Sequence, residues 1–596
     1  DKSNQVARIH GIVGLTQLAR MDKKDHADAI VPLLKDSDPE IAALAAKWLG
    51  DIRYEKANSV LIENLKHPNA RVQFFNAEAL GRAKAKEAIQ PLIELLEANN
   101  DVDAYLRHGV TYALSQIGEV EPLAALSSHP SKAVRLGAVL ALRRLESPEL
   151  AKFLADSDEY IVTETARAIH DDFSVEAALP ALGALLPTTT FQNEPLIRRA
   201  ISANQRVGKD ENLNHILAFL GKSGMPEVLR KEALAAIGTW AKPSLVDRVD
   251  GRYRGEVKRD ASLIRDQVKP ILIASASDRA EQIRVEAIKA IGKLEIADAA
   301  DLLLTKIKTD PADPVKIQAL NSLVAMNAPN LSQAISRAMG DNSQSVRVAG
   351  LGLLAQTDLP KDQKVALLTD IIQKRTVPEK QTALTTLAGL EGAKDLPVWK
   401  AILADFDAGK LPEGTWIELE EAIKATGSAE LKAEFTGLLD EKSGGEEWKK
   451  FAGALADGNI RRGRTIFFEN QTAQCIRCHA YDDMGGNAGP ALDNIGNVLS
   501  KEELLIALVE PSKRLAPGYG TISLEMNSGE KITGTLMEDG KEILKVMVGA
   551  EEKNISRSDI KSSQIAPSSM PPMGTLLSKR EIRDLVSYLS VLRRRE

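Results

Sequence analysis

The chain has 596 residues, with 77 lysines and arginines against 83 aspartates and glutamates, which gives a formal net charge of −6. This length exceeds what one hydrophobic core organises, so we expect several domains or a repeat array. The slightly acidic balance leaves no overall basic footprint for a nucleic acid, and no apolar run of about 18 residues predicts a membrane span.

From about residue 8 to residue 440 the sequence repeats a pair of apolar helices joined by a short polar turn. The step from Ile41 to Val72 is 31 residues, as is the step from Gly50 to Gly81. Each pair has apolar residues on one face, which it can bury only against the next pair. The pattern resembles HEAT repeats and predicts a curved α-solenoid over residues 1–440. The period lapses at residues 247–254, where we expect a loop or irregular repeat, or alternatively a docking surface.

Seven of the eight histidines lie in this solenoid. They are scattered over the predicted helices and turns without a common spacing. We therefore expect capping or solvated side chains rather than metal ligands at these positions: His10, His26, His67, His108, His129, His170 and His215.

Both cysteines of the chain lie in the segment Cys475-Ile476-Arg477-Cys478-His479. In a Cys-x-x-Cys-His arrangement the two thiols form thioethers with the haem vinyl groups, and the histidine donates a ring nitrogen to the iron. A zinc site would need a fourth ligand, and a thioredoxin-like dithiol would need a βαβ setting, whereas residues 481–490 read as a loop. The segment predicts one covalent haem c, with zinc and a redox dithiol as the alternatives.

The residues around this segment predict a small helical domain. A Gly/Ser break at residues 442–445 ends the solenoid, and a helix over residues 446–467 follows. Ser500 and Glu503 form a capping box for a helix that Pro511 ends. A second capping box, at Ser578, begins a C-terminal helix that we expect to pack across the 446–467 helix.

Between these helices the pattern changes to alternating apolar and polar residues. Turn residues at 527–529 and 539–540 separate short alternating runs, as in β-hairpins. We therefore expect an antiparallel β insert at about residues 518–565. The predicted fold is mostly α: a HEAT-like solenoid over residues 1–440, then an α-helical c-type cytochrome domain over residues 441–596 that carries this insert.

The iron face opposite His479 needs a second ligand, and six methionines are candidates. Met570 lies in a Pro-flanked loop just before the C-terminal helix, where a thioether could cap the iron, so it is the first candidate metal ligand beside His479. Met573 is the second candidate, and an open or different sixth position is the third. Met484 is too close to His479 in sequence, and the remaining methionines are expected to pack inside the β insert: Met526, Met537 and Met547.

The motifs of residues 446–596 together resemble the haem-binding domain family common in Planctomycetes and Verrucomicrobia. In that family the domain follows HEAT repeats, which often follow a β-propeller resembling the quinoprotein glucose/sorbosone dehydrogenases. This sequence has no such propeller, so substrate and quinone residues cannot be carried over. The motifs that carry the resemblance are the Cys-x-x-Cys-His segment, Gly489-Pro490-x-Leu492, Glu510-Pro511-Ser512-x-Arg514, Pro517-Gly518-Tyr519, Ser569-Met570-Pro571 and Leu577-Ser578.

The resemblance implies roles for individual residues. Cys475 and Cys478 would carry the thioethers, and His479 and Met570 would be the axial ligands. By analogy with c-type cytochromes, the Pro490 carbonyl is a candidate to accept the His479 Nδ1 proton. Arg477 and Arg514 are candidate partners for the haem propionates.

The expected function is electron transfer in the bacterial periplasm, from a dehydrogenase domain or partner to a periplasmic acceptor, with no catalytic site in this chain. No signal-peptide pattern follows Asp1, so we expect that a preceding segment has been removed or left out. One alternative is a haem enzyme or sensor with an open iron site, such as a peroxidase, although residues 446–596 offer no distal histidine. The other is a scaffold whose solenoid binds a partner and in which the haem is secondary.

Overall fold

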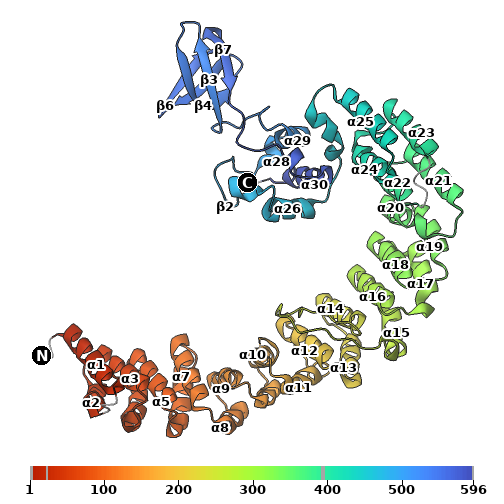
Figure 1. Ribbon diagram of the computed structural model, residues 1–596. Helices are drawn as coiled ribbons and strands as arrows, with labels where there is room; N and C mark the ends of the chain where they lie inside the picture. The colour runs from red at the N-terminus through yellow and green to blue at the C-terminus, as the bar shows by residue number, and fades with distance from the viewer. Residues whose placement is uncertain (1–3, 22–24, 173, 391–395, 594–596) are drawn as a thin grey trace. The chain divides into compact units, whose positions relative to one another are not determined.

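The computed structural model describes residues 4–21, 25–172, 174–390 and 396–593. The chain forms two compact units, residues 1–328 and 329–596, and both are mostly helical (Figure 1). The domain boundary predicted at 440/441 lies within the second unit. In the described part of the chain, no helix has the length and apolar character needed to cross a bilayer.

The first unit is a succession of helix pairs in which the second helix of each pair packs against that of the next, as in the series α3, α5 and α7 (Figure 1). Its α-helices are α1 (Gln5–Arg20), α2 (Asp25–Asp28), α3 (Pro39–Asp51), α4 (Asn58–Glu63), α5 (Ala70–Arg82), α6 (Ile89–Asn99), α7 (Ala104–Ile117), α8 (Val120–Ala124), α9 (Lys132–Arg144), α10 (Glu159–His170), α11 (Leu179–Ala184), α12 (Glu194–Val207), α13 (Asp210–Leu220), α14 (Glu227–Gly238), α15 (Arg265–Ser275), α16 (Glu281–Lys293), α17 (Ala300–Thr309) and α18 (Asp313–Ala325).

The repeated glycines explain the 31-residue period. A Cβ atom on Gly50 would lie 2.7 Å from the Cα atom of Ala79, and one on Gly81 would lie 2.5 Å from that of Ala113. Both glycines therefore sit where α3 meets α5 and α5 meets α7, and any side chain there would push adjacent repeats apart. The stacked helix pairs predicted from the periodicity are confirmed within the first unit.

His67 Nδ1 accepts a hydrogen bond from the backbone N–H of Asn69 at 3.0 Å, and His129 Nδ1 accepts one from that of Ser131 at 3.1 Å. Asn69 and Ser131 are the N-cap residues of α5 and α9, so both histidines support a helix start, close to the predicted capping role.

Two solenoid histidines depart from the predicted roles. One is His215, whose Nδ1 lies 3.0 Å from the Oδ1 of the buried Asn204. The expectation is also wrong for His170, whose residue exposure is 0%. His170 lies in a buried ionic cluster, which is described below.

The second unit begins with further helix pairs: α19 (Leu331–Met339), α20 (Gln344–Gly352), α21 (Lys361–Lys374), α22 (Val377–Gly389), α23 (Leu396–Asp407), α24 (Trp416–Thr426) and α25 (Ala429–Ser443). The helices after this point are the 3₁₀ helix η12 (Glu447–Leu455), α26 (Ile460–Glu469), α27 (Cys475–Cys478), α28 (Ile495–Val498), α29 (Lys501–Val509) and α30 (Lys579–Leu589). Capping boxes at Ser500 and Ser578 open α29 and α30, as the sequence predicts.

Helices α26 and α30 pack closely against each other. A Cβ atom on Gly463 of α26 would lie 2.0 Å from the Asp584 carbonyl oxygen of α30, so only glycine permits this approach. Beside it, the rings of Phe467 and Tyr588 lie 5.8 Å apart between centroids. Both aromatic residues belong to one apolar cluster that also includes buried leucines of α29 and α30.

The single helix predicted over residues 446–467 is wrong, because the chain breaks between η12 and α26. Asn459 caps α26 by accepting from the Arg462 N–H at 3.0 Å. Side chains of α30 bind the backbone of the break: Asp584 accepts from the Asn459 N–H at 2.7 Å, and Ser587 accepts from the Gly458 N–H at 2.8 Å. A local helical pattern cannot reveal partners that lie more than a hundred residues further along the chain.

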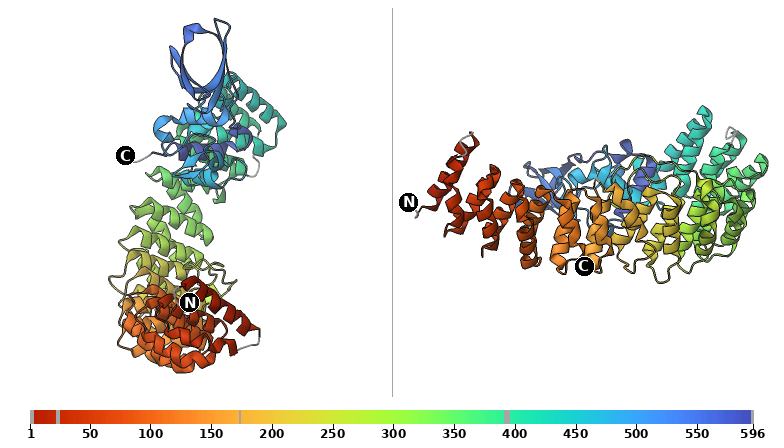
Figure 2. Two further views of the ribbon diagram at one scale, coloured as in Figure 1. Left: turned by 90° about the vertical axis from the view of Figure 1, so that its left-hand side faces the viewer. Right: turned by 90° about the horizontal axis from the view of Figure 1, so that it is seen from below.

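The predicted β insert is confirmed as a five-stranded antiparallel sheet in the order β6-β5-β4-β3-β7, and its strands curl strongly around their apolar face (Figure 2). That face carries buried residues such as Leu524 and Val546. The strands are β3 (Gly520–Met526), β4 (Lys531–Asp539), β5 (Ile543–Val548), β6 (Glu551–Ser556) and β7 (Ile560–Ile565).

Candidate functional site

The two cysteines stand at the two ends of a single helical turn, α27. Neither forms a disulfide; Cys475 is partly buried and Cys478 is exposed. Burial raises the pKa of the Cys475 thiol to about 11. A thiol with so high a pKa is protonated at neutral pH, so Cys475 itself is a weak nucleophile.

His479 follows this turn directly and has a defined orientation. Its Nδ1 lies 2.8 Å from the Pro490 carbonyl oxygen. Because a carbonyl oxygen can only accept, Nδ1 carries the proton and Nε2 keeps a lone pair for a ligand. The Gly489 N–H donates to the Cys478 carbonyl at 2.8 Å, and the Leu492 N–H donates to the Ala480 carbonyl at 2.9 Å. Residues 489–492, here called the return segment, are therefore held on both sides of Pro490.

Gly489 packs against the face of the imidazole. A Cβ atom at this position would lie 2.6 Å from Cε1 and 2.8 Å from Nδ1 of His479. Both distances are far shorter than a van der Waals contact, so a side chain here would displace the ring or the return segment.

We expect Gly489→Ala to destabilise the second unit by about 1–3 kcal/mol, the usual cost of overpacking. The measurement is urea denaturation followed by hydrogen exchange of peptides around residue 479. Gly437→Ala is the matched control, because a Cβ atom there meets nothing within 4 Å. Equal stability of the two variants would contradict the contact between Gly489 and His479.

The segment predicted as a loop, residues 481–490, is irregular over residues 486–490, but its first part is ordered as strands. It forms a short hairpin of β1 (Ala480–Tyr481) and β2 (Met484–Gly485), in which Asp482 and Asp483 both have positive φ. Such a turn matches the twist of a two-residue hairpin loop. The Gly486 N–H then donates to the Ile476 carbonyl at 3.0 Å, which folds the hairpin back on α27.

The two arginines predicted to contact propionates are both exposed. Arg477 Nη1 donates to the Gln474 side chain at 3.1 Å. Arg514 Nη1 donates to Glu503 at 2.7 Å, so it would have to leave this ion pair to bind another carboxylate. The propionate roles of both residues remain predictions.

The methionines differ clearly in their surroundings. Met573 is 3% exposed and belongs to the apolar cluster of α26, α29 and α30. Met570 is half-buried at the edge of the same cluster, against which Cys475 also packs. Met484 is 53% exposed on the hairpin. A sulfur that is to contact an additional group must not be fully enclosed, so this distribution favours Met570 over Met573.

These residues fit the requirements of a covalent haem. The two thiols are unpaired and one turn apart, and the histidine tautomer leaves Nε2 for a metal. A thioether lies on the cluster that supports Cys475. Covalent attachment requires the two thiols, and the iron requires the imidazole nitrogen; a soft thioether is a suitable sixth ligand.

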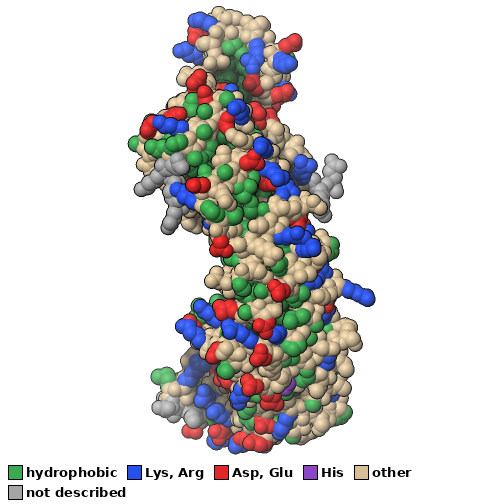
Figure 3. Space-filling view, turned by 90° about the vertical axis from the view of Figure 1, so that its right-hand side faces the viewer, with side chains coloured by type: hydrophobic (Ala, Val, Ile, Leu, Met, Phe, Trp, Pro, Cys, Tyr) green, Lys and Arg blue, Asp and Glu red, His purple; other side chains and the backbone are tan. Residues whose placement is uncertain are grey.

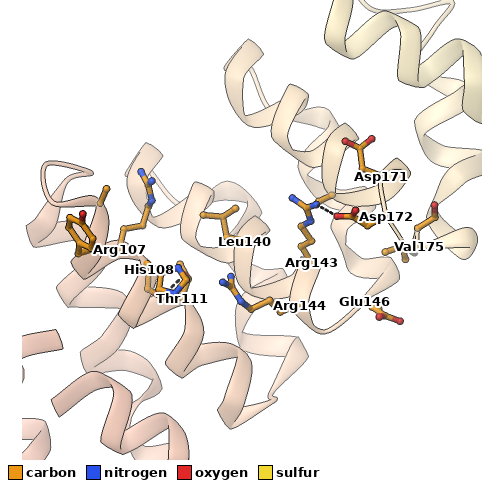
Figure 4. Close-up of a pocket in the computed structure, with 14 residues that line it drawn as sticks. Arg107, His108, Thr111, Leu140, Arg143, Arg144, Glu146, Asp171, Asp172 and Val175 are labelled. Atoms are coloured by element: carbon orange, nitrogen blue, oxygen red, sulfur yellow. Dashed lines mark hydrogen bonds and ion pairs between the residues drawn. The ribbon is translucent and has the colours of Figure 1, made fainter. Parts of the chain in front are cut away.

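A second candidate site is a groove of about 910 Å³ in the first unit, between α7, α9 and α10 (Figure 4). Tyr105 on its rim is 84% exposed. Charges of both signs balance along the lining: Arg107, Arg143 and Arg144 against Glu146, Asp171 and Asp172. The face drawn in Figure 3 likewise mixes both signs without a large area of one charge. The groove therefore offers contact area without selecting the charge of an occupant.

A third candidate site is a cluster of charged residues around His170, which borders the groove through Asp171. The Nδ1 of His170 lies 3.0 Å from Asp171 and its Nε2 lies 3.4 Å from Asp247, which comes from the loop at residues 247–254. His170, Asp171 and Asp250 could place ligand atoms within 4.8 Å of one another. However, Arg199 pairs with Asp171 at 2.7 Å and Arg254 pairs with Asp250 at 2.5 Å, so guanidinium groups already supply the positive charge.

This cluster is not predicted from the sequence, although the lapse of the repeat period at residues 247–254 marks the segment that builds it. Arg254 of the lapsed segment donates to the carbonyls of His170 and Asp172 at 3.2 and 2.9 Å. The segment is thus an irregular loop that packs on its own solenoid. Its best explanation is structural, since its charged groups are engaged within the first unit.

The cluster predicts a pH-dependent stability of the first unit. Burial lowers the pKa of His170, but the hydrogen bonds to Asp171 and Asp247 outweigh burial, and the net pKa is raised. Its stabilisation is therefore complete below the unfolded pKa of about 6.5 and is lost as the pH rises through the folded pKa. For Asp171, burial raises the pKa, but His170 and Arg199 outweigh burial and lower it to about 2, so its contribution is lost as the pH falls below about 4.

We expect hydrogen exchange of α10 to be slowest between about pH 4 and 6.5, relative to the intrinsic exchange rate at each pH. His170→Gln should flatten the alkaline side of this profile. His108→Gln is the control, because His108 is exposed, and it should keep the original profile. An unchanged profile in His170→Gln would show that the cluster does not set this pH dependence.

Comparisons with known proteins support the solenoid. A family model for HEAT repeats matches residues 3–73 and 27–115. No curated protein matches the chain. Among solved structures, importin beta in an ammonium sulfate condition is 12% identical, with 72% of this chain and 68% of that chain covered and a TM-score of 0.35.

Two other solved structures are similarly distant. A complex of Kap95p with RanGDP is 12% identical over 83% of this chain and 74% of that chain, with a TM-score of 0.38. An engineered protein is 18% identical over 54% of this chain and 97% of that chain, with a TM-score of 0.28. These scores are too low to carry an argument. The family match and the stacked helix pairs together show that the chain carries HEAT repeats at its N-terminal end.

Proposed function

We propose that this chain is a periplasmic c-type cytochrome that transfers electrons, with one covalent haem held by residues 441–596 and the HEAT solenoid as its scaffold. The observation that carries the proposal is the arrangement of the Cys-x-x-Cys-His turn, in which the His479 Nδ1 is bound by the Pro490 carbonyl at 2.8 Å. A bound haem would supply one-electron redox chemistry.

The residues of the chain have separate tasks in this proposal. Cys475 and Cys478 fix the group covalently, and His479 presents Nε2 to the metal. The Pro490 carbonyl holds the tautomer of the ring, and Gly489 leaves room for its face. Met570 is the proposed second ligand, because Met573 is enclosed in the core.

The proposed partners are a dehydrogenase that donates electrons and a periplasmic protein that accepts them. Electron transfer needs no acid or base at the metal, and the two proposed axial ligands, the Met570 thioether and the His479 imidazole whose Nδ1 is bound by a carbonyl, supply none. The two cysteines would bind the haem vinyl groups rather than the metal. This composition distinguishes the proposal from a peroxidase, which needs a distal acid–base group.

The test is an optical and near-infrared spectrum of the purified protein in both redox states, with and without carbon monoxide. We expect a low-spin spectrum, the charge-transfer band of a methionine-ligated ferric haem, and slow binding of carbon monoxide. A high-spin spectrum with rapid carbon monoxide binding would instead favour an open site, and a protein without haem would refute the proposal.

A scaffold function is the second candidate. It is favoured by the HEAT-repeat match and by the groove with the exposed Tyr105 in the first unit. Large exposed aromatic residues often anchor protein interfaces. The two functions are compatible, since a solenoid that binds a redox partner would bring that partner to the same chain.

A further inference from the structure

Two motifs of the sequence analysis have no role in the proposed function so far: Glu510-Pro511-Ser512 and the stretch before Met570. They are more than fifty residues apart and the β insert lies between them. In the structure they meet. The Ser568 N–H donates to the Ser512 hydroxyl at 3.0 Å, and the Met570 N–H donates to the Ser568 hydroxyl at 3.1 Å.

The Ser512 end of this contact is itself fixed. Pro511 is buried at the end of α29, and the neighbouring Glu510 carboxylate accepts from the Trp448 N–H at 3.1 Å. Trp448 belongs to the apolar cluster of the second unit. The backbone next to Ser512 is therefore held, and its exposed hydroxyl lies where it accepts from the Ser568 N–H.

The other end of the Met570 segment is anchored by Met573. Its side chain is 3% exposed within the apolar cluster, and its carbonyl accepts from the Leu576 and Leu577 N–H groups at 3.0 and 2.9 Å. Gly574, the next residue, packs on the ring of Phe451, since a Cβ atom there would lie 2.7 Å from it. The chain thus cannot slide at this end without disturbing the core.

We propose that residues 568–573 form a clamp that presents the Met570 sulfur, with the Ser512 hydroxyl holding one end and the enclosed Met573 holding the other. The clamp rests on the proposed function in that the presented sulfur is the second haem ligand. Ser512, Ser568 and Met573 are positioning residues, since none of them is a ligand. The two ends of the β insert are already joined, because β3 pairs with β7 and the Ala566 N–H donates to the Thr521 carbonyl at 2.8 Å; the Ser512 hydrogen bond adds one contact beyond this pairing.

The first test uses hydrogen exchange of residues 566–573 and does not depend on haem. Ser512→Ala removes the acceptor of the Ser568 N–H, so we expect exchange in this segment to quicken about fivefold, the factor that one net hydrogen bond contributes. Ser512→Thr keeps a hydroxyl and should restore slow exchange. Ser569→Ala is the matched control, because this side chain lies in the same segment but is exposed and is neither of the two anchors. Equal exchange in Ser512→Ala and the unaltered protein would overturn the clamp.

The second test uses the haem-loaded protein and reports on the ligand. Ser512→Ala should weaken the methionine charge-transfer band and speed carbon monoxide binding by about the same fivefold factor, because the open form of the segment becomes more populated. Met573→Leu, which conserves volume, should keep the band, whereas Met573→Ala should weaken it. Loss of the band in Met573→Leu would overturn the assignment of Met573 as an anchor.

The two tests separate failure of the clamp from failure of the proposed function. If the unaltered protein carries no covalent haem, the proposed function fails, and the exchange experiment still decides whether Ser512 holds the segment. If haem is bound with a methionine ligand but the Ser512→Ala spectrum matches that of Ser569→Ala, the proposed function stands and the clamp is overturned.

Discussion

The double variant Cys475→Ala, Cys478→Ala is expected to lose covalent haem completely when the protein is produced in a bacterial periplasm that attaches haem. The reason is chemical: the two thiols of α27 are the only cysteines of the chain, so no other side chain can form a thioether. The measurement is the mass of the denatured protein, together with extraction of haem into acidified organic solvent. The unaltered protein should carry the mass of one haem that resists extraction.

Single variants and a neighbour give the controls. Cys475→Ala and Cys478→Ala each leave one thiol, so attachment through one thioether stays possible and the haem yield should fall without vanishing. Gln471→Ala, at an exposed residue just before the turn and outside the motif, should attach haem normally. Haem that stays covalently bound in the double variant, or an unaltered protein that attaches none, would refute the assignment of the segment.

The solenoid could be predicted because its information is local and repeated. The glycines at Gly50 and Gly81 recur at one period, and each meets an alanine of the next repeat. The β insert could be predicted for the same reason, since its hairpin turns show in the sequence around Asn527 and Asp539. Strands β6 and β7 were not predicted individually, because their polar residues do not alternate clearly.

The features that the sequence did not reveal depend on contacts between distant segments. The break before α26 is set by Asp584 and Ser587 of α30. The burial of His170 depends on Asp247, which follows 77 residues later on an irregular loop. No local pattern encodes such pairs. The sequence therefore predicts one helix over residues 446–467 where the structure has two, and a capping or solvated side chain for His170 where the structure has a buried one.

The candidate site was predictable where its residues are close in sequence. The cysteine turn, His479 and the Pro490 carbonyl lie within 16 residues of one another, and the structure brings His479 and Pro490 together. The choice between Met570 and Met573 as second ligand depends on more than the local sequence, because both lie in one Pro-rich loop. Burial distinguishes them, and burial is a property of the whole second unit rather than of the loop.

A buried ion pair connects the last solenoid repeats to α30 within the second unit. Arg583 of α30 donates to Glu418 of α24 at 2.8 Å, and the side chains are 9% and 3% exposed. One turn earlier on α30, Arg580 pairs with Glu421 at 2.5 Å, where the side chains are 37% and 45% exposed. Arg580 Nη1 also lies 3.4 Å from Glu418, so Glu418 faces both arginines, whereas Glu421 pairs with Arg580 at the exposed edge of the same two helices.

Glu418→Ala is expected to destabilise the packing of α24 on α30 by about 3–5 kcal/mol, because it leaves the Arg583 guanidinium buried without its carboxylate. A chain of two units need not unfold in one step, so the measurement is native-state hydrogen exchange of peptides from α24 and α30. Both peptides should lose protection together, while peptides of the first unit should keep theirs.

The exposed pair is the matched control: Glu421→Ala should change the same protection by about 0–1 kcal/mol, because water screens the charges that remain. The double variant Glu418→Met, Arg583→Met should recover most of the loss caused by Glu418→Ala, since it buries two apolar side chains in place of one unpaired charge. If the double variant were as unstable as Glu418→Ala, the pair itself would hold α30 in place. If Glu418→Ala and Glu421→Ala were equally mild, water would reach Arg583, and the burial on which the prediction rests would be wrong.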